Sequence, residues 1–211
     1  MNKELPYHHG DLRAALVKAA AAEIERGGYE TLSLRELAAS LDVSRAAPYR
    51  HFDDRRALLA ALAAEGFDEL AGIYRKATAA EKTPQARLAA SGRAYLAFAA
   101  DRPQLFRLMF ASDLFGGGPL DPALLKAAGD CYDVFEGIVT ATLDDPDDST
   151  IKAATIAIMS SSYGFALLRM GGRLKPFMVG GLTQSELIDT VLSMKATKLP
   201  RAARQKRRKK S

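Results

Sequence analysis

Apolar residues recur at intervals of three and four positions through most of the chain, which is the spacing of one face of an α-helix. Alternating runs of β-branched residues, which are typical of strands, are absent. Glycine, proline and capping residues divide the pattern into successive helices. Three of them are expected to open at Thr83, Asp121 and Ser149, and Thr183 with Glu186 forms the box that opens the last one. The predicted helices cover residues 12–26, 34–41, 45–51, 55–80, 84–101, 103–112, 122–143, 150–170 and 184–195. The sequence therefore predicts an all-α fold.

The strongest local signals for helix boundaries and a turn follow the first predicted helix. Ser33 and Glu36 form a capping box, which predicts that a helix begins near Leu34. Residues 42–44 are the expected tight turn. Val43 and Phe52 bracket the helix predicted over 45–51 and should anchor it to the core. Pro48, near its start, is expected at a half-buried site and should cost about one hydrogen bond. The helix buries little else, so its small, cationic and aromatic side chains are free to contact another molecule. Two short helices joined by a tight turn are the helix-turn-helix arrangement, whose second helix enters the major groove of DNA.

The long predicted helix 55–80 follows the Asp53–Asp54 pair, whose carboxylates favour a helix N-terminus. This helix leaves the small N-terminal domain and enters the rest of the chain, so it is the expected mechanical link between the two. We expect a three-helix, helix-turn-helix domain over 1–55, a larger helical bundle for ligand binding and dimerisation over 56–195, and a basic disordered tail over 196–211.

The net charge of +5 is unevenly distributed. Residues 195–211 hold nine Lys/Arg and no Asp/Glu, whereas residues 1–64 hold nine of each kind. The basic balance therefore comes from the tail, and DNA contacts in the N-terminal domain depend on a few locally placed cations. The tail itself either adds nonspecific attraction for phosphates or is simply solvated.

Several classes of protein are excluded by what the sequence lacks. Cys131 is the single cysteine, so no internal disulfide is possible, and its apolar context predicts a buried thiol. His8 and His9 have no further ligands at metal-binding spacing, so neither a metal nor a cofactor is expected. No nucleophile–base set, carboxylate pair or phosphate loop supports an enzyme. No signal-peptide core and no apolar run near the ~18 residues that span a membrane are found, so a cytoplasmic protein without membrane contact is expected.

The stretch around the predicted turn resembles the DNA-binding domain of TetR-type bacterial transcriptional regulators. The matching residues are Gly28, Thr31, Ser33, Arg35, Leu37, Ala38, Leu41, Val43, Ser44, Tyr49, His51, Phe52, Arg55, Leu58 and Leu59. The resemblance implies a homodimer that binds double-stranded DNA at a palindromic operator, with two recognition helices in successive major grooves. It also implies a small-molecule effector in the C-terminal domain.

Ten residues are candidates for DNA contacts on the strength of this resemblance. They are Thr31, Ser33, Arg35, Ser44, Arg45, Ala46, Ala47, Tyr49, His51 and Arg55. The residues at 45–47 would lie deepest in the major groove, where an arginine can bind guanine through two hydrogen bonds. Tyr49, His51 and Arg55 match phosphate-contacting positions, and Tyr49 can also reach a base. Arg35 matches a position that reaches a base or a phosphate, and Thr31 and Ser33 match contacts with the DNA backbone.

The segment 93–110 resembles the C-terminal domain of the TetR subgroup named for a Trp-His-Gly signature in a later helix. The signature aligns with residues 159–164. Met159 and Tyr163 replace the tryptophan and the histidine there, and Gly164 is retained. The ligand-site residues of that subgroup are therefore not carried over to this chain.

Aromatic and apolar residues on four C-terminal helices are the candidates for an effector cavity, although such residues also form ordinary cores. They are Tyr95, Phe98, Phe106, Met109, Phe110, Tyr132, Phe135, Met159 and Tyr163. Because no charged residue clearly belongs among them, we expect a small, mostly apolar ligand.

The last two long helices are the candidates for a homodimer interface. Small residues recur along 150–170, and Leu187, Ile188, Val191 and Leu192 form an apolar stripe along 184–195. Two such helices from each subunit would form the four-helix interface that the family implies. The same residues also fit an intramolecular core.

The predicted function is a repressor that the ligand releases from its operator. The alternatives are an activator of the same fold and a nonspecific, nucleoid-type DNA binder that uses the basic tail.

Overall fold

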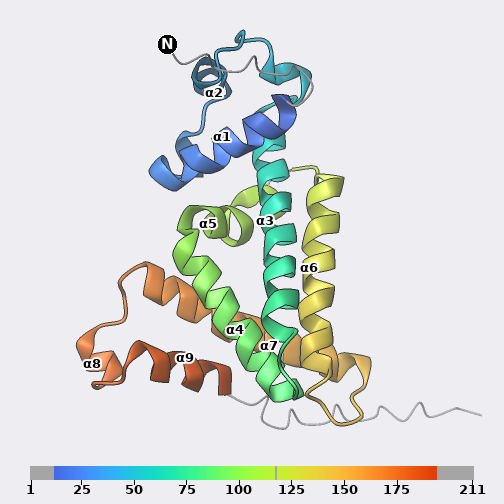
Figure 1. The fold of residues 1–211 in the computed structure, drawn as a ribbon, viewed down its shortest axis with the longest axis vertical. Coiled ribbons are helices and arrows are strands. Elements are labelled where there is room, and N and C mark those ends of the chain that lie inside the picture. The colour runs from blue at the N-terminus through green and yellow to red at the C-terminus, as the bar shows by residue number, and fades with distance from the viewer. Residues whose placement is uncertain (1–11, 117, 194–211) are drawn as a thin grey trace, which may run out of the picture.

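The computed structural model describes residues 12–116 and 118–193, and all regular structure in this part of the chain is helical (Figure 1). The elements are α1 (Leu12–Gly27), η2 (Tyr29–Thr31), α2 (Leu34–Ser40), η3 (Pro48–Arg50), α3 (Arg55–Thr78), α4 (Pro84–Asp101), α5 (Pro103–Ala111), η4 (Asp113–Phe115), α6 (Pro122–Thr140), α7 (Asp148–Met170), α8 (Pro176–Val179) and α9 (Gln184–Ser193). The predicted all-α fold is confirmed. The predicted N-terminal arm and basic tail lie outside the described residues.

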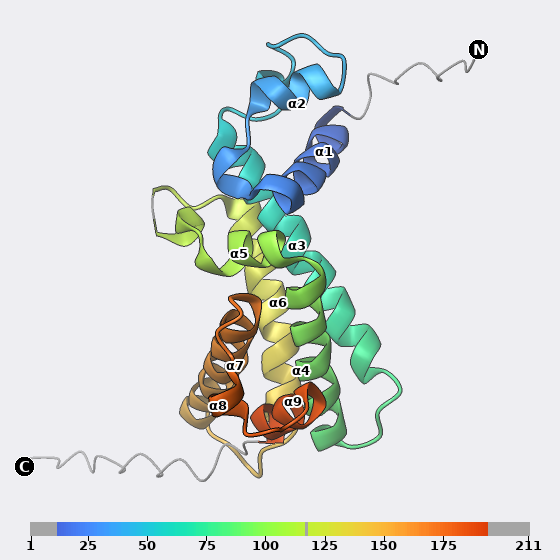
Figure 2. The same ribbon diagram turned by 90° about the vertical axis from the view of Figure 1, so that its left-hand side faces the viewer.

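The long helix α3 runs along most of the molecule (Figures 1 and 2). Its N-terminal end packs under α1, and the rest of it packs against α4, α5 and α6. Gly66 of α3 faces α5, and a Cβ atom there would lie 2.6 Å from Met109 Sδ. The glycine therefore allows α5 to approach α3 closely, and the predicted role of α3 as the link between the two parts of the chain agrees with its course.

Most helices begin at the predicted capping residues. The side chains of Ser33, Asp54, Thr83 and Asp121 each accept a hydrogen bond from the backbone N–H three residues ahead. The prediction that Ser149 caps the next helix was wrong. Asp147 is the cap of α7, and its carboxylate accepts from the N–H of Thr150 at 2.8 Å and from the Ser149 hydroxyl at 2.9 Å. A carboxylate is the stronger acceptor at a helix N-terminus, so it takes the cap position.

Two helices end earlier than predicted, and one short helix is additional. The long link ends at Thr78 and α6 ends at Thr140, each before the predicted end. The short helix α8 was not predicted. At α9 the expected box forms in both directions, because the Thr183 N–H donates to Glu186 Oε2 at 2.7 Å and the Glu186 N–H donates to Thr183 Oγ1 at 3.3 Å.

A cluster of aromatic rings fills the space between α3, α4, α5 and α7. Phe106 is fully buried at its centre, with ring centroids 5.4 Å from Tyr95, 4.9 Å from Phe110 and 6.0 Å from Tyr163. The Phe67 ring of α3 meets Phe110 edge-on at 5.4 Å. Such edge and offset contacts add to the free energy that burial itself contributes.

The single cysteine lies on α6. Cys131 is buried, as the sequence predicted, and burial raises the pKa of its thiol to about 12. The thiol is therefore protonated at neutral pH and behaves as a small apolar side chain.

Helix α7 has one exposed apolar face. It is 23 residues long, and an 18-residue window in it has a mean hydropathy of 1.4 with 28% of the window buried, so by length and composition it could cross a membrane. The expectation that no segment has these properties was wrong for α7. In the structure α7 packs against α4, α6 and α9. On the opposite face Ile156 is 58% exposed, and Met159 and Leu167 are each 36% exposed.

Replacing Phe106 with alanine is expected to lower the free energy of unfolding by about 3–5 kcal/mol, because it removes a fully buried ring and leaves a cavity. Phe177→Ala is the matched control, since Phe177 is 86% exposed. It should change the value by less than about 0.5 kcal/mol. Urea denaturation followed by circular dichroism measures both. Equal effects of the two substitutions would contradict the burial of Phe106.

Candidate nucleic-acid interface

The turn after α2 is built by backbone hydrogen bonds around one left-handed residue. Asp42 has φ +53°, a region that aspartate enters more readily than most residues. The N–H of Val43 donates to the carbonyl of Ala38 at 3.0 Å, and the N–H of Asp42 donates to Ala39 at 3.2 Å. This pair of bonds is the Schellman motif, which ends a helix and reverses the chain. It fixes the direction in which the following segment leaves α2.

The following segment is not the regular α-helix that was predicted over 45–51. It is a turn followed by the 3-10 helix η3. The N–H of Ala47 donates to the Ser44 carbonyl at 2.9 Å and the N–H of Arg50 donates to Ala47 at 3.2 Å, both over three residues. The cause is Pro48, which has no N–H to donate to Ser44 over four residues, as an α-helix requires. The tighter winding uses the donors that remain.

Two side chains of this segment face inward and hold it to the domain. Pro48 is buried, and Phe52 is 4% exposed. The guanidinium carbon of Arg13 on α1 lies 5.3 Å from the centroid of the Phe52 ring, a cation–π contact. The sequence predicted the anchoring role of Phe52, but Pro48 is more deeply buried than expected and the contact of Arg13 was missed. Arg13 lies 39 positions before Phe52, so no local pattern relates them.

The other side chains of the segment face solvent. Arg45 and His51 are exposed, and Tyr49 is 48% exposed. Ser44 and Ala46 are also exposed, whereas Ala47 is half-buried. The small residues leave the backbone open to close approach by a large partner, and the polar groups suit phosphates and base edges.

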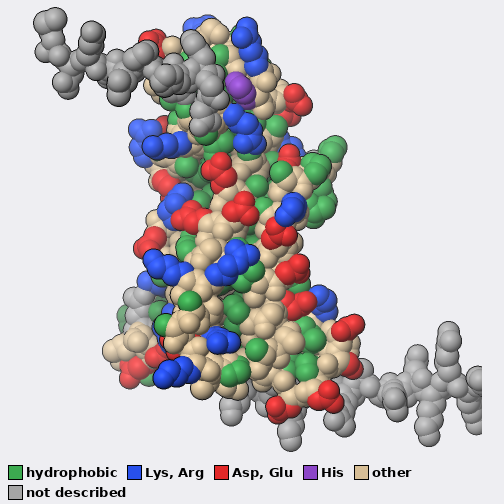
Figure 3. Space-filling view, turned by 45° about the vertical axis from the view of Figure 1, so that its right-hand side comes forward, with side chains coloured by type: hydrophobic (Ala, Val, Ile, Leu, Met, Phe, Trp, Pro, Cys, Tyr) green, Lys and Arg blue, Asp and Glu red, His purple; other side chains and the backbone are tan. Residues whose placement is uncertain are grey.

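Cations at this end of the molecule are not neutralised locally. Arg35 of α2, Arg45 and Arg50 are exposed and make no ion pair with any residue in 12–116 or 118–193. Figure 3 shows Lys and Arg side chains at this end, with a histidine beside them. Lys and Arg that pair with no carboxylate keep their full attraction for phosphates.

Three of the ten predicted DNA-contact residues have side chains that make hydrogen bonds within the domain. The Thr31 hydroxyl lies 3.3 Å from the carbonyls of Gly27 and Gly28 at the end of α1. Ser33 caps α2. The guanidinium of Arg55 donates to the Tyr29 carbonyl, and its Nε is buried with no partner among the described residues. Their contacts with DNA stay predictions, and each also has a structural role.

The nine residues predicted to line an effector cavity do not share one surface. Five are buried, namely Tyr95, Phe98, Phe106, Met109 and Phe135. Phe110 and Tyr163 pack against the aromatic cluster, while the Tyr132 hydroxyl donates to Glu136 at 2.7 Å and Met159 is 36% exposed. Desolvation raises the pKa of the Tyr95 phenol well above its ordinary value, so the group is neutral. Their part in ligand binding stays a prediction.

A cavity of about 320 Å³ lies beside the aromatic cluster, between α4, α5 and α7. Its lining residues are Leu96, Ala99, Ala100, Pro103, Gln104, Arg107, Ala166, Arg169 and Met170. The lining side chains are apolar apart from one amide and two arginines. None of these residues was predicted, because the predicted cavity residues were mainly aromatic, and most of those rings pack against one another.

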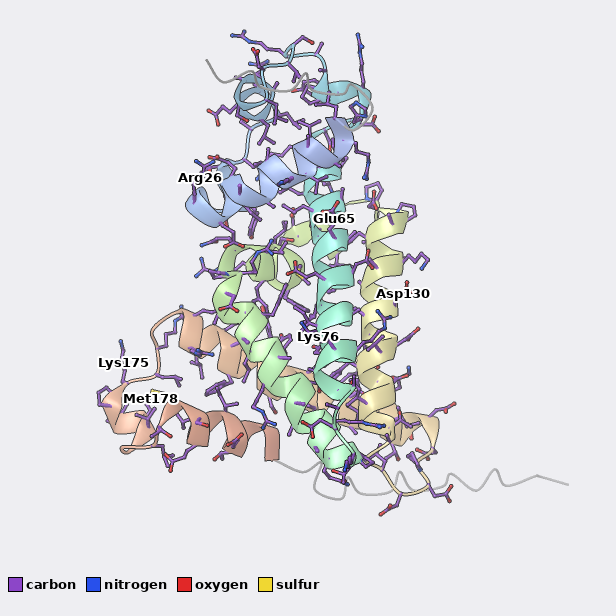
Figure 4. All side chains as sticks on the ribbon, viewed as in Figure 1. Arg26, Glu65, Lys76, Asp130, Lys175 and Met178 are labelled. Atoms are coloured by element: carbon purple, nitrogen blue, oxygen red, sulfur yellow. The ribbon has the colours of Figure 1, made fainter. Side chains whose placement is uncertain are left out.

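The DNA-binding end is attached to the rest of the chain at several points besides α3 itself. The Glu25 carboxylate of α1 accepts from the backbone N–H of Gln104 at 3.2 Å and of Leu105 at 3.1 Å. Arg56, near the start of α3, donates to the carbonyls of Asp113 at 3.2 Å and Leu114 at 2.8 Å. In Figure 4, Arg26 marks the end of α1 that lies next to α5.

Comparison with known proteins supports the assignment of a helix-turn-helix domain followed by a helical C-terminal domain. Residues 16–62 match the bacterial regulatory proteins of the tetR family, and residues 88–192 match the tetracyclin repressor-like C-terminal domain. A protein of unknown function from Rhodococcus sp. RHA1 is 34% identical, with a TM-score of 0.73, and the match covers 90% of this chain and 93% of that one. The chain belongs to the TetR family.

Other TetR-like structures share the fold at lower identity. A tetR-family regulatory protein from Rhodococcus RHA1 is 24% identical, with a TM-score of 0.60, over 88% of this chain and 97% of that one. The regulator FadR from Bacillus subtilis, solved in complex with stearoyl-CoA, is 15% identical, with a TM-score of 0.65, over 85% and 95% of the two chains. No curated protein matches the chain.

The TetR assignment covers the helix-turn-helix and the C-terminal domain, but no match supports the Trp-His-Gly subgroup. At the aligned positions Met159 is partly exposed on α7. The Tyr163 hydroxyl lies 3.4 Å from the Phe110 carbonyl. The subgroup therefore stays a prediction.

Two arginines of the TetR domain should differ in their effect on stability. Arg55→Ala is expected to lower the free energy of unfolding by about 1–2 kcal/mol, because it removes a charged donor to the Tyr29 carbonyl. Arg45→Ala should change it by less than about 0.5 kcal/mol, because Arg45 is exposed and its side chain makes no ion pair within residues 12–116 and 118–193. Urea denaturation of the two variants decides this. A larger loss for Arg45→Ala would contradict its free position.

Proposed function

We propose that this TetR-family regulator is a cytoplasmic homodimeric repressor that binds a palindromic operator and leaves it when a small, mostly apolar ligand binds. The observation that carries the proposal is the exposed set of cations on the helix-turn-helix, Arg35, Arg45 and Arg50, which pair with no carboxylate of the described chain. The N-terminal domain is nearly neutral overall, so these placed groups, rather than general charge, would select the DNA site.

The proposed roles of the contact residues follow from their positions. Arg45 lies at the start of the exposed segment and would reach a base edge, where two hydrogen bonds to guanine discriminate by about 1–3 kcal/mol. Tyr49 and His51, further along, would contact phosphates. Arg55 has a second role within the domain, so we expect its phosphate contact to contribute less to DNA binding than the contacts of the exposed residues.

The proposed dimer uses α7 together with α9. Ile156, Ser160 and Leu167 recur at helical spacing on the exposed face of α7, opposite the face that packs on α4 and α6. Leu187 and Ile188 of α9 are half-buried against the core of their own chain. A partner that covered the α7 face would remove this apolar surface from water. The side chains of Val191 and Leu192, also predicted at this interface, lie outside the described residues.

The proposed effector site is the cavity between α4, α5 and α7. Leu96, Ala99 and Met170 give it an apolar wall, and Arg107 and Arg169 add positive charge at its edge. A mostly apolar ligand with one acidic group fits this lining. FadR, which shares the fold, was solved with stearoyl-CoA, so the architecture accommodates a ligand with a long apolar part.

Replacing Arg45 or Tyr49 with alanine is expected to weaken binding to the operator. For Arg45 the loss should be about 5- to 150-fold, because its base contact is worth about 1–3 kcal/mol. The operator is first selected from random double-stranded DNA with the wild-type protein. Mobility-shift titrations at low salt then give the affinities. Lys76→Ala, a change on the lower half of α3 (Figure 4), is the control and should bind as the wild type does. Unchanged affinity of both test variants would refute the proposed interface.

The nonspecific alternative makes a different prediction for the tail. If the chain is a nucleoid-type binder, removal of residues 200–211 should abolish all DNA binding. If it is an operator-specific regulator, the truncated protein should retain its selected site with a weaker dependence on salt. Transcription from an operator-linked promoter, with and without the protein, separates a repressor from an activator.

Ile156→Lys is expected to shift the protein from dimer to monomer, because it places a charge in the proposed apolar interface. Leu125→Lys on α6 is the matched control, since Leu125 is 52% exposed and lies outside α7 and α9. Sedimentation velocity over a range of concentrations gives the oligomeric state. A dimer that tolerates Ile156→Lys would place the interface elsewhere.

A further inference from the structure

Helix α5 begins without a capping side chain from its own segment. Its N-cap residue, Arg102, makes no side-chain cap hydrogen bond, and Pro103 occupies the first helical position. The next two backbone N–H groups, of Gln104 and Leu105, are instead bound by the Glu25 carboxylate, at 3.2 and 3.1 Å. These are the groups that a helix leaves without an internal partner. The cap of α5 therefore comes from α1, in the DNA-binding domain.

The Glu25 carboxylate also belongs to a small charged junction. Arg102 Nε lies 3.7 Å from Glu25 Oε1, and the Arg102 guanidinium binds both carboxylate oxygens of Glu69 on α3 at 3.2 and 3.3 Å. The Glu25 side chain is 25% exposed, so most of it is shielded from water. Shielding and the positive end of α5 both strengthen the hold on a carboxylate. The junction ties α1, α3 and the start of α5 together.

The same end of α5 forms part of the cavity. Pro103, Gln104 and Arg107 line it, so one residue, Gln104, has its N–H bound by Glu25 and also borders the cavity. A molecule in the cavity would touch α5 beside the residue that α1 caps. Gly28, just after α1, lies close as well, since a Cβ there would be 3.8 Å from Gln104 Oε1. The contact thus joins the cavity wall directly to α1.

We propose that Glu25 is a positioning residue that sets the orientation of the DNA-binding domain according to the position of α5. Two hydrogen bonds from consecutive N–H groups to one carboxylate hold only if α1 and α5 move together. An occupant of the cavity that displaces α5 therefore either carries α1 with it or breaks the cap. The use of this coupling to release DNA rests on the proposed function, but the coupling itself does not require DNA binding.

The first test measures the cap in the full-length protein. Hydrogen exchange by NMR follows the amides of Gln104 and Leu105 in wild type, Glu25→Ala and Glu23→Ala. Glu23 is the matched control, because its ion pair with Arg26 at 2.5 Å stays within α1. Glu25→Ala should speed exchange of both amides about tenfold, the effect of losing a capping side chain, and Glu23→Ala should not. Equal exchange in all three proteins would overturn the proposal.

The second test measures orientation. Spin labels at Ser40→Cys on α2 and Gln85→Cys on α4 report the distance between the two parts of one chain, and an excess of unlabelled protein removes distances between subunits. The buried Cys131 does not compete for the label. Glu25→Ala should broaden the distance distribution and Glu23→Ala should leave it unchanged. Fast amide exchange with an unchanged distribution would show that the cap is only local, and would overturn the positioning role.

The third test uses the cavity without an identified ligand. Ala100→Trp adds an indole at a residue that lines the cavity and is exposed. It should shift the spin-label distance when Glu25 is present and leave it unshifted in the Glu25→Ala protein. A shift of the same size in both proteins, or no shift in either, would overturn the coupling. None of these measurements contains DNA. A failure to find an operator would therefore count against the proposed function, but it would not change the result of the three tests of the coupling.

Discussion

Both parts of the molecule depend on α3 remaining one continuous helix. Its first turn carries Arg55, which binds the Tyr29 carbonyl, and Arg56, which binds the segment after α5. Its middle part is packed closely against α5, where a Cβ atom at Gly66 would meet the side chains of Met109 and Leu105. A helix held at this many points transmits displacement as a rigid rod. Any change in the bundle that tilts α3 must therefore move the helix-turn-helix.

The architecture followed from local signals in the sequence. Helix starts were predicted well where a capping side chain and an apolar face agree, as at Ser33, Asp54 and Thr83. Such caps act over three residues, so a short stretch of sequence contains the whole interaction. Helix ends were less accurate, because the last turn depends on packing against distant parts of the chain. The family comparison confirms the fold and the TetR assignment.

The details of the site were predicted less completely, for two physical reasons. Pro48 was expected to cost one hydrogen bond, but its missing N–H is the donor of the first α-helical bond, so the whole segment is wound differently. Glu25 binds N–H groups 79 and 80 positions away, and the two arginines of the cavity come from separate helices. Contacts of this range have no periodicity or motif. They emerge only when the helices are packed together.

The exposed segment after α2 is held in place by Pro48 and Phe52, whereas the side chains proposed to contact DNA lie between and before these two anchors. Its backbone course is set by Pro48, by the left-handed Asp42 and by the buried ring of Phe52. The helix propensities of residues 45–47 have little influence on it. Mutations at those exposed positions can therefore accumulate with little penalty to folding. If these positions contact bases as proposed, the preferred DNA sequence would change with their side chains while the scaffold that holds them is retained.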